Sequence, residues 1–135
     1  MARLVIDTNS LIQCVSHKSQ YHKLWLSFVY GSNQLCVSTE ILNEYAEILQ
    51  RKTSGRFTEL AMNVIVNNPN TIFITPYFRF NAIAADPDDN KFVDCAVAGQ
   101  AQFIITEDGH YDILKKQAFP RINIIGLDDA MRILL

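Results

Sequence analysis

The chain has no apolar run that approaches the roughly 18 residues of a membrane-spanning helix. The long apolar region of a signal peptide is also missing, because Asp7 interrupts the first apolar run after three residues. We therefore expect a cytoplasmic protein without a membrane partner. The sequence also lacks internal repeats, low-complexity segments and a convincing linker, so residues 1–135 are most simply one domain.

Cysteine and excess positive charge are scarce as well. The three cysteines form no CxxC motif and have no metal-like spacing to the three histidines, which predicts reduced core thiols at Cys14, Cys36 and Cys95. The net charge of −2 is unlike that of a typical nucleic-acid-binding protein. It does not exclude such a partner, because divalent cations bound by a cluster of acids would reverse the local charge.

The sequence does contain a regular alternation of strand and helix patterns. Short apolar runs predict strands at 3–6, 34–38, 71–75, 103–106 and 122–125. Helices are predicted from near Ser10, over about 20–29, 39–52 and 57–66, after the DPDDN turn at 86–90, and over 111–117 and 127–135. This order predicts the α/β class, as a single three-layer domain with a central parallel sheet of about five strands flanked by helices.

Carboxylates follow four of the predicted strands. Asp7 ends the buried run LVI, where an unpaired carboxylate is costly. Further acids lie on helix 39–52, in the DPDDN turn and at Asp108. Ligands of open parallel sheets bind beyond the carboxyl ends of the strands, so we expect these side chains to converge. Oxygen ligands without paired His or Cys favour one or two hard cations, Mg²⁺ or Mn²⁺.

Helical spacing ranks these acids. On helix 39–52, Glu44 borders the apolar face centred near Tyr45, whereas the other two glutamates lie toward solvent. After the DPDD turn, Asp89 lies near the stripe that contains Phe92, and Asp94 falls on the other side of a helix that is apolar nearly all round. We predict that the remaining acids of the turn, Asp86 and Asp88, are turn and cap residues.

Three segments, taken in order, resemble the PIN domain: VIDTNSLI near the N-terminus, VSTEILNEY in the middle and DPDDNKFVDCAVAGQAQFIITEDGHYDIL near the end. The resemblance extends from Arg3 to about Leu127 and is strongest to bacterial toxin components of toxin–antitoxin systems, related to VapC-type toxins. It implies a Rossmann-related fold and a metal-dependent ribonuclease that hydrolyses RNA phosphodiester bonds. An antitoxin protein and a second copy of the chain, in a homodimer, are the partners it suggests.

The resemblance also implies roles for individual residues. The catalytic acids would be Asp7, Glu44, Asp89 and Asp108, and the metal ligands Asp7, Asp89, Asp94 and Asp108. Polar residues that orient these carboxylates would be Thr8, Asn9, Ser38 and Thr106. Glu107 departs from the family pattern, in which small or basic residues are frequent before the last acid.

A basic loop, RKTSGR, is the candidate for contacts with substrate phosphates. Its cations are Arg51, Lys52 and Arg56. The same residues are equally well explained as cations that complement the dipole at a helix C-terminus.

Two enzyme classes that also use an aspartate after a strand fit less well. A haloacid-dehalogenase-type phosphotransferase needs a second Asp two residues after the first, where this chain has Asn9. A response-regulator receiver needs a phospho-acceptor after a middle strand, and the segment TIFITPYF supplies none. A non-catalytic PIN-fold module that binds RNA or a protein stays open as the alternative to a ribonuclease.

Overall fold

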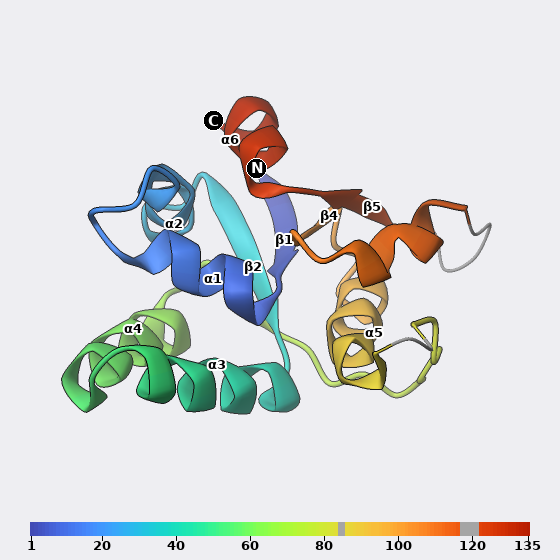
Figure 1. The fold of residues 1–135 in the computed structure, drawn as a ribbon, viewed down its shortest axis with the longest axis horizontal. Helices are drawn as coiled ribbons and strands as arrows, with labels where there is room; N and C mark the ends of the chain where they lie inside the picture. Colours follow the sequence, from blue (N-terminus) through green and yellow to red (C-terminus); the bar gives the residue numbers. More distant parts are fainter. Residues whose placement is uncertain (84–85, 117–121) are drawn as a thin grey trace.

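The computed structural model describes residues 1–83, 86–116 and 122–135. Figure 1 shows a twisted sheet with helices on both faces. The strands are β1 (Ala2–Ile6), β2 (Asn33–Val37), β3 (Thr71–Phe73), β4 (Phe103–Ile105) and β5 (Asn123–Ile125). The α-helices are α1 (Thr8–Val15), α2 (His22–Val29), α3 (Thr39–Lys52), α4 (Gly55–Asn67), α5 (Asn90–Ala98) and α6 (Leu127–Leu134). The described residues also form two 3₁₀ helices, η1 (Pro87–Asp89) and η2 (Gly109–Lys116).

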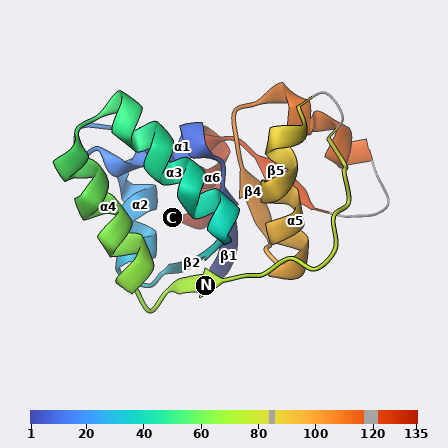
Figure 2. The same cartoon turned by 90° about the horizontal axis from the view of Figure 1, so that it is seen from below.

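All four strand pairs are parallel, in the order β3-β2-β1-β4-β5, which confirms the predicted α/β sheet. The chain first steps from β1 outward to β2 and β3, and then crosses back to β4 and β5. Because parallel crossovers are right-handed, this reversal puts α5 on the face opposite α1–α4. Figure 2 shows this arrangement, with α3 and α4 on one side of the sheet and α5 on the other.

The core is continuous across these layers, and it fixes the strand ends. Val5, Leu35, Ile104 and their neighbours are almost completely buried, as expected for a sheet covered on both faces. Tyr45 of α3 is fully buried, and its hydroxyl donates to the carbonyl of Ile6, the last residue of β1. This contact ties the longest helix to the point where the chain leaves the sheet at Asp7.

The structure corrects several predicted boundaries by a few residues. The first helix begins at Thr8, not near Ser10, because the Asp7 carboxylate accepts from the Ser10 amide and caps the helix two residues earlier. The third strand ends at Phe73 instead of residue 75. The segment predicted as a helix over 111–117 is the 3₁₀ helix η2, and Gln117 lies outside the described residues. Within the described ranges, no helix is both long and apolar enough to span a bilayer.

Candidate active site

The reversal of strand order between β1 and β4 brings two acid-bearing segments together. Asp7 follows β1 directly, and the segment from Thr106 to Asp108 follows β4. The two strands are hydrogen-bonded neighbours, and the Asp7 amide donates to the Ile105 carbonyl at 3.1 Å. Such a switch point is where open α/β sheets bind ligands, so the fold itself predicts a site here.

Thr106 links the two segments through its hydroxyl. The hydroxyl donates to Oδ2 of Asp7 and accepts from the Asp108 amide at 3.0 Å. The other Asp7 oxygen accepts from the Ser10 amide at 2.9 Å. Burial raises the pKa of Asp7, whereas these hydrogen bonds oppose the rise. Asp7 is therefore a buried carboxylate whose two oxygens are held by the Thr106 hydroxyl and the Ser10 amide.

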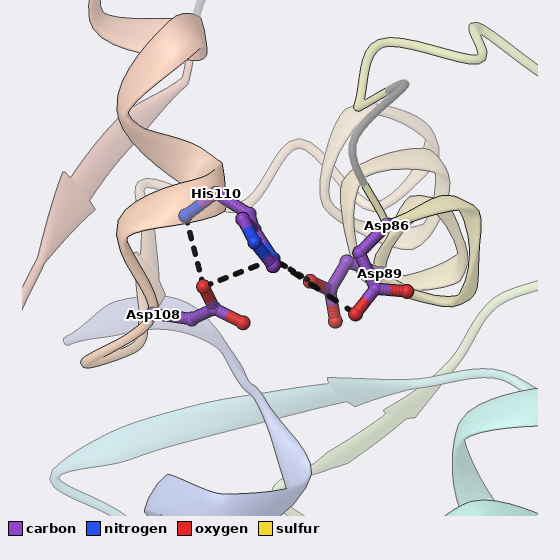
Figure 3. A group of neighbouring side chains, drawn as sticks. All are labelled: Asp86, Asp89, Asp108 and His110. Atoms are coloured by element: carbon purple, nitrogen blue, oxygen red, sulfur yellow. Dashed lines mark hydrogen bonds and ion pairs between the residues drawn. The ribbon is translucent and has the colours of Figure 1, made fainter.

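Three acids and one histidine form a compact group (Figure 3). Asp86, Asp89, Asp108 and His110 each place one potential ligand atom so that all four atoms lie within 4.8 Å of one another. The His110 ring lies between the acids: its Nδ1 is 3.2 Å from Asp108 and 3.9 Å from both Asp86 and Asp89. We call these four residues the acid–histidine cluster.

Asp89 is the least satisfied member of the cluster. Its Oδ2 is buried and accepts no hydrogen bond from the described residues. Burial and the negative charges of Asp86, Asp108 and Asp7 together raise the pKa of Asp89 to about 7, and a hydrogen bond from Tyr111 opposes the rise. A buried carboxylate oxygen without a donor, surrounded by other acids, fits a bound cation. Because three of the four groups are carboxylates, a hard divalent ion such as Mg²⁺ or Mn²⁺ suits the cluster.

Sequence reasoning missed Asp86 and His110 as members of this cluster. Asp86 does cap η1, as predicted, since its Oδ1 accepts from the Asp88 amide at 3.2 Å, but its Oδ2 faces His110. His110 follows Asp108 by two residues, and its amide donates to the Asp108 carboxylate at 2.8 Å. The short spacing between Asp108 and His110 was the available signal, because a turn that lets an Asp side chain accept from the amide two residues on also keeps the second side chain close.

Glu44 lies at the edge of the site but has its own partners. Its Oε1 is 2.7 Å from the Lys91 ammonium, and its Oε2 accepts from the Thr8 hydroxyl. Thr8 follows Asp7 directly in the chain, so Glu44 contacts the neighbour of the aspartate whose carboxylate caps α1. Ser38 caps α3, accepting from the Ile41 amide at 3.3 Å, and thereby fixes the start of the helix that carries Glu44.

The structure does not bring Asp94 into the cluster. Only 2% of Asp94 is exposed, and its Oδ1 accepts from the Phe80 amide at 3.0 Å. Burial raises the pKa of Asp94, the nearby Arg79 charge opposes the rise and the Glu40 charge adds to it. Arg79 in turn forms an ion pair with Glu40 at 2.9 Å. In this structure Asp94 anchors the loop between β3 and α5, which explains a buried acid on that helix without a metal.

A cavity of about 460 Å³ opens beside the cluster. Asp7, Asp108, Glu107, Asn9, Lys52, Ile12 and Gln13 line it. Of the predicted cationic loop, Lys52 reaches this cavity, and its ammonium is 3.4 Å from Asn9 Oδ1. Arg51 instead pairs with Glu47 at 2.6 Å, and Arg56 is exposed in the first turn of α4.

Glu107, the departure from the family pattern, has a local explanation. Its Oε1 accepts from the Leu127 amide at 2.9 Å, at the N-terminus of α6. A carboxylate there satisfies a free backbone donor and interacts favourably with the helix dipole. The Gly126 position is adjacent, since a Cβ placed there would lie 3.0 Å from a Glu107 oxygen. Glu107 therefore ties the last helix to the segment that carries Asp108.

The cysteines are free and buried, as predicted. Burial raises the pKa of Cys14 and of Cys95 to about 12 and that of Cys36 to about 11. The thiolate is the reactive form, so these three residues are not poised as nucleophiles. They are core side chains.

The fold and the site define a doubly wound α/β protein with an acidic centre at its switch point. A family model for the PIN domain matches residues 3–110, so the chain belongs to the PIN domain family. No curated protein sequence matches the chain significantly.

Solved structures share the fold at low sequence identity. A chain of the crystal structure of VapBC2 from Rickettsia felis, bound to a DNA fragment from its promoter, superposes with a TM-score of 0.63 at 12% identity, over 92% of this chain and 98% of that one. A chain of DNA-bound VapBC from Salmonella typhimurium superposes with a TM-score of 0.62 at 15% identity, over 94% of this chain and 99% of that one. The PIN domain endonuclease Utp24 superposes with a TM-score of 0.54 at 17% identity, over 92% of this chain and 84% of that one. At these identities the likeness supports the fold alone.

Proposed function

We propose that the protein is a metal-dependent endoribonuclease that acts as the toxin of a toxin–antitoxin pair. The observation that carries this proposal is the buried Oδ2 of Asp89, which accepts no hydrogen bond from the described residues and lies inside the acid–histidine cluster. A nuclease of the PIN family needs a cation at this end of the sheet, and the cluster offers four ligand atoms for one. Membership of the family and the fold of VapBC chains support the same reading.

The proposed chemistry is hydrolysis of an RNA phosphodiester. A bound Mg²⁺ or Mn²⁺ would lower the pKa of the attacking water and neutralise charge on the phosphoryl oxygens. Asp86, Asp89, Asp108 and His110 would hold the ion, and Asp7 would add a carboxylate from the adjacent cavity wall. The water oxygen bonds to phosphorus, the bond to the 3′ oxygen breaks, and that oxygen takes up a proton. The ends would be a 5′-phosphate and a 3′-hydroxyl, as the family resemblance implies.

Lys52 is the cation proposed to hold the RNA backbone. It lines the same cavity as Asp7 and Asp108, where a phosphate next to the cleaved bond would pass. We expect Lys52→Ala to raise KM for RNA several-fold and to leave kcat little changed. The rise corresponds to the loss of one charge-assisted contact with a phosphate, worth about 1 kcal/mol of binding free energy. Steady-state cleavage of a labelled RNA measures both constants.

Arg51→Ala is the matched control for Lys52→Ala. Arg51 is the neighbouring cation in the last turn of α3, but it is exposed and pairs with Glu47 outside the cavity. An equal rise in KM for the two variants would mean that general positive charge at the helix end, and not the position of Lys52, holds the substrate.

We further propose a protein partner and a cytoplasmic location. The three buried free thiols support a reducing compartment. An apolar hollow of about 160 Å³ between α2 and α4 supports a protein-binding surface, either for an antitoxin or for a second copy. Its lining residues are Val15, Trp25, Phe57, Leu60, Ala61 and Val64. The mass in solution, measured by light scattering with and without a candidate antitoxin, distinguishes a homodimer from a heterocomplex.

Cleavage of a structured RNA pool by the purified chain tests the activity. The arms contain Mg²⁺, Mn²⁺ or EDTA, and a parallel set uses Asp7→Asn. Cutting that needs metal and is lost in the variant establishes the ribonuclease. If RNA is bound but not cut in any arm, the non-catalytic PIN-fold module is the correct reading.

A further inference from the structure

Lys91 occupies a position that ordinary electrostatics disfavours. It lies in the first turn of α5, where the positive end of the helix dipole repels a cation. Its side chain is only 13% exposed, although lysines are seldom buried without a partner. Two residues earlier, at the end of η1, Asp89 enters the acid–histidine cluster. A lysine held here against these costs needs a specific counter-charge.

Glu44 supplies that charge, and both of its oxygens have partners. The Lys91 ammonium is 2.7 Å from Glu44 Oε1 and donates to the Asp88 carbonyl at 2.7 Å. The other Glu44 oxygen accepts from the Thr8 hydroxyl. The pair therefore bridges α3 on one face of the sheet and α5 on the other, immediately beside Asp7.

The contrast with Asp89 decides how many ions the site takes. Asp89 Oδ2 has no hydrogen-bond donor among the described residues, whereas Glu44 already has an ammonium and a hydroxyl. Two-metal sites place their ions about 3.5–4 Å apart and need carboxylates on both sides. Here the acid on the Glu44 side is already neutralised by a cation of the protein itself.

We propose that the site binds one divalent ion, in the acid–histidine cluster, and that Lys91 provides the second positive charge. This inference rests on the proposed function. An ammonium has three N–H donors, and Glu44 and Asp88 accept two of them. The third donates to a phosphoryl oxygen of the substrate and stabilises the charge that grows there as the water attacks. Glu44 is then a positioning residue, which holds Lys91 and does not bind the ion.

The number of ions bound by the wild-type chain is the direct test. Mn²⁺ titration by calorimetry, with free Mn²⁺ followed by electron paramagnetic resonance, is expected to give one ion per chain. Two ions of similar affinity would overturn the inference and leave the ribonuclease proposal intact. No bound ion, together with no cleavage, would instead mean failure of the proposed function. This test needs no variant and so does not depend on how a substitution folds.

Variants of Lys91 test its role in the reaction. Lys91→Met keeps the length of the side chain and removes its charge, so kcat is expected to fall about 100-fold, as for the loss of one donor to a developing oxyanion. Freed of its ammonium, Glu44 is expected to admit a second Mn²⁺ in this variant. Lys91→Arg keeps the charge and is expected to retain one ion and most of the activity.

Lys23→Met is the matched control, because Lys23 is an exposed lysine on α2, outside the site. It is expected to behave as wild type in both assays. Unchanged kcat and one bound ion in Lys91→Met would overturn the role proposed for Lys91.

Discussion

Replacing Asp89 with asparagine is expected to abolish cleavage and, at the same time, to stabilise the metal-free protein. Asparagine has the shape of aspartate but no charge, so the cluster loses the buried carboxylate oxygen that accepts no hydrogen bond from the described residues. We expect cleavage in Mn²⁺ to fall by a factor on the order of 1,000 or more, since metal-assisted charge stabilisation supplies several kcal/mol. Initial rates on a labelled RNA measure this loss.

The gain in stability follows from the same environment. In the metal-free protein Asp89 is buried among Asp86, Asp108 and Asp7, and its pKa is raised because the charged form is disfavoured there. Removing the charge relieves this repulsion, so the melting temperature of Asp89→Asn in EDTA at pH 8 should exceed that of wild type. Repulsion between acids at a functional centre lowers the stability of the fold, and such a loss is common where activity requires an unfavourable arrangement of charges.

Asp129→Asn serves as the control for Asp89→Asn. Asp129 is an exposed acid in the first turn of α6, paired with Arg132 at 3.0 Å. Its replacement should leave cleavage unchanged and should not raise the melting temperature. If Asp89→Asn cuts RNA at the wild-type rate, or melts lower than wild type in EDTA, then Asp89 is not a metal ligand held under repulsion.

The sheet and half of the site could be predicted from the sequence because their determinants are local. Asp7 and Asp108 each follow a short apolar strand, and in a parallel sheet the ends of neighbouring strands share one edge. The 3.6-residue period of 39–52 also placed Tyr45 in the core and Glu44 at its border. In each case a residue's neighbours along the chain were enough to fix its position.

The rest of the site depends on contacts that no local pattern encodes. The chain between β3 and α5 has no regular structure over residues 74–83, so the sequence gives no period from which to place Asp86. Asp94 is buried but is satisfied by the amide of Phe80, fourteen residues earlier in that loop. Similarly, the pairing of Lys91 with Glu44 joins helices that are separated by a whole crossover. Burial of a polar residue could be predicted from the sequence, but its partner could not.

The second large effect expected is a pH-dependent stabilisation by divalent metal. Burial and neighbouring negative charges raise the pKa of Asp89 to about 7, and the pKa of Asp7 is raised in the same direction. A carboxyl group with a raised folded-state pKa stabilises the fold fully below its unfolded pKa of about 4, and this stability is lost as the pH rises through the folded value. The metal-free protein should therefore lose stability between about pH 4 and pH 7.

A divalent ion acts in the opposite sense, because it binds the deprotonated cluster and replaces the proton. At pH 8 and a metal concentration of 100 times Kd, binding contributes about 2.7 kcal/mol, which corresponds to a rise in melting temperature of about 5–10 °C. At pH 5 protons compete with the ion for the carboxylates of the cluster, so the rise in melting temperature on adding metal should be small. Melting curves at both pH values, with Mn²⁺ and with EDTA, measure this difference.

Asp89→Asn separates this mechanism from general effects of pH and salt, because it removes the group that titrates and leaves the other acids of the cluster. Its metal-free melting temperature should vary less between pH 5 and pH 8 than that of wild type, and Mn²⁺ should raise it little at either pH. Equal stabilisation of wild type and variant at pH 8 would place the bound ion elsewhere on the surface. An unchanged wild-type melting temperature in millimolar Mn²⁺ at pH 8 would mean that no ion offsets the cost of the buried acids, and that the cluster is held by its hydrogen bonds and by His110 alone.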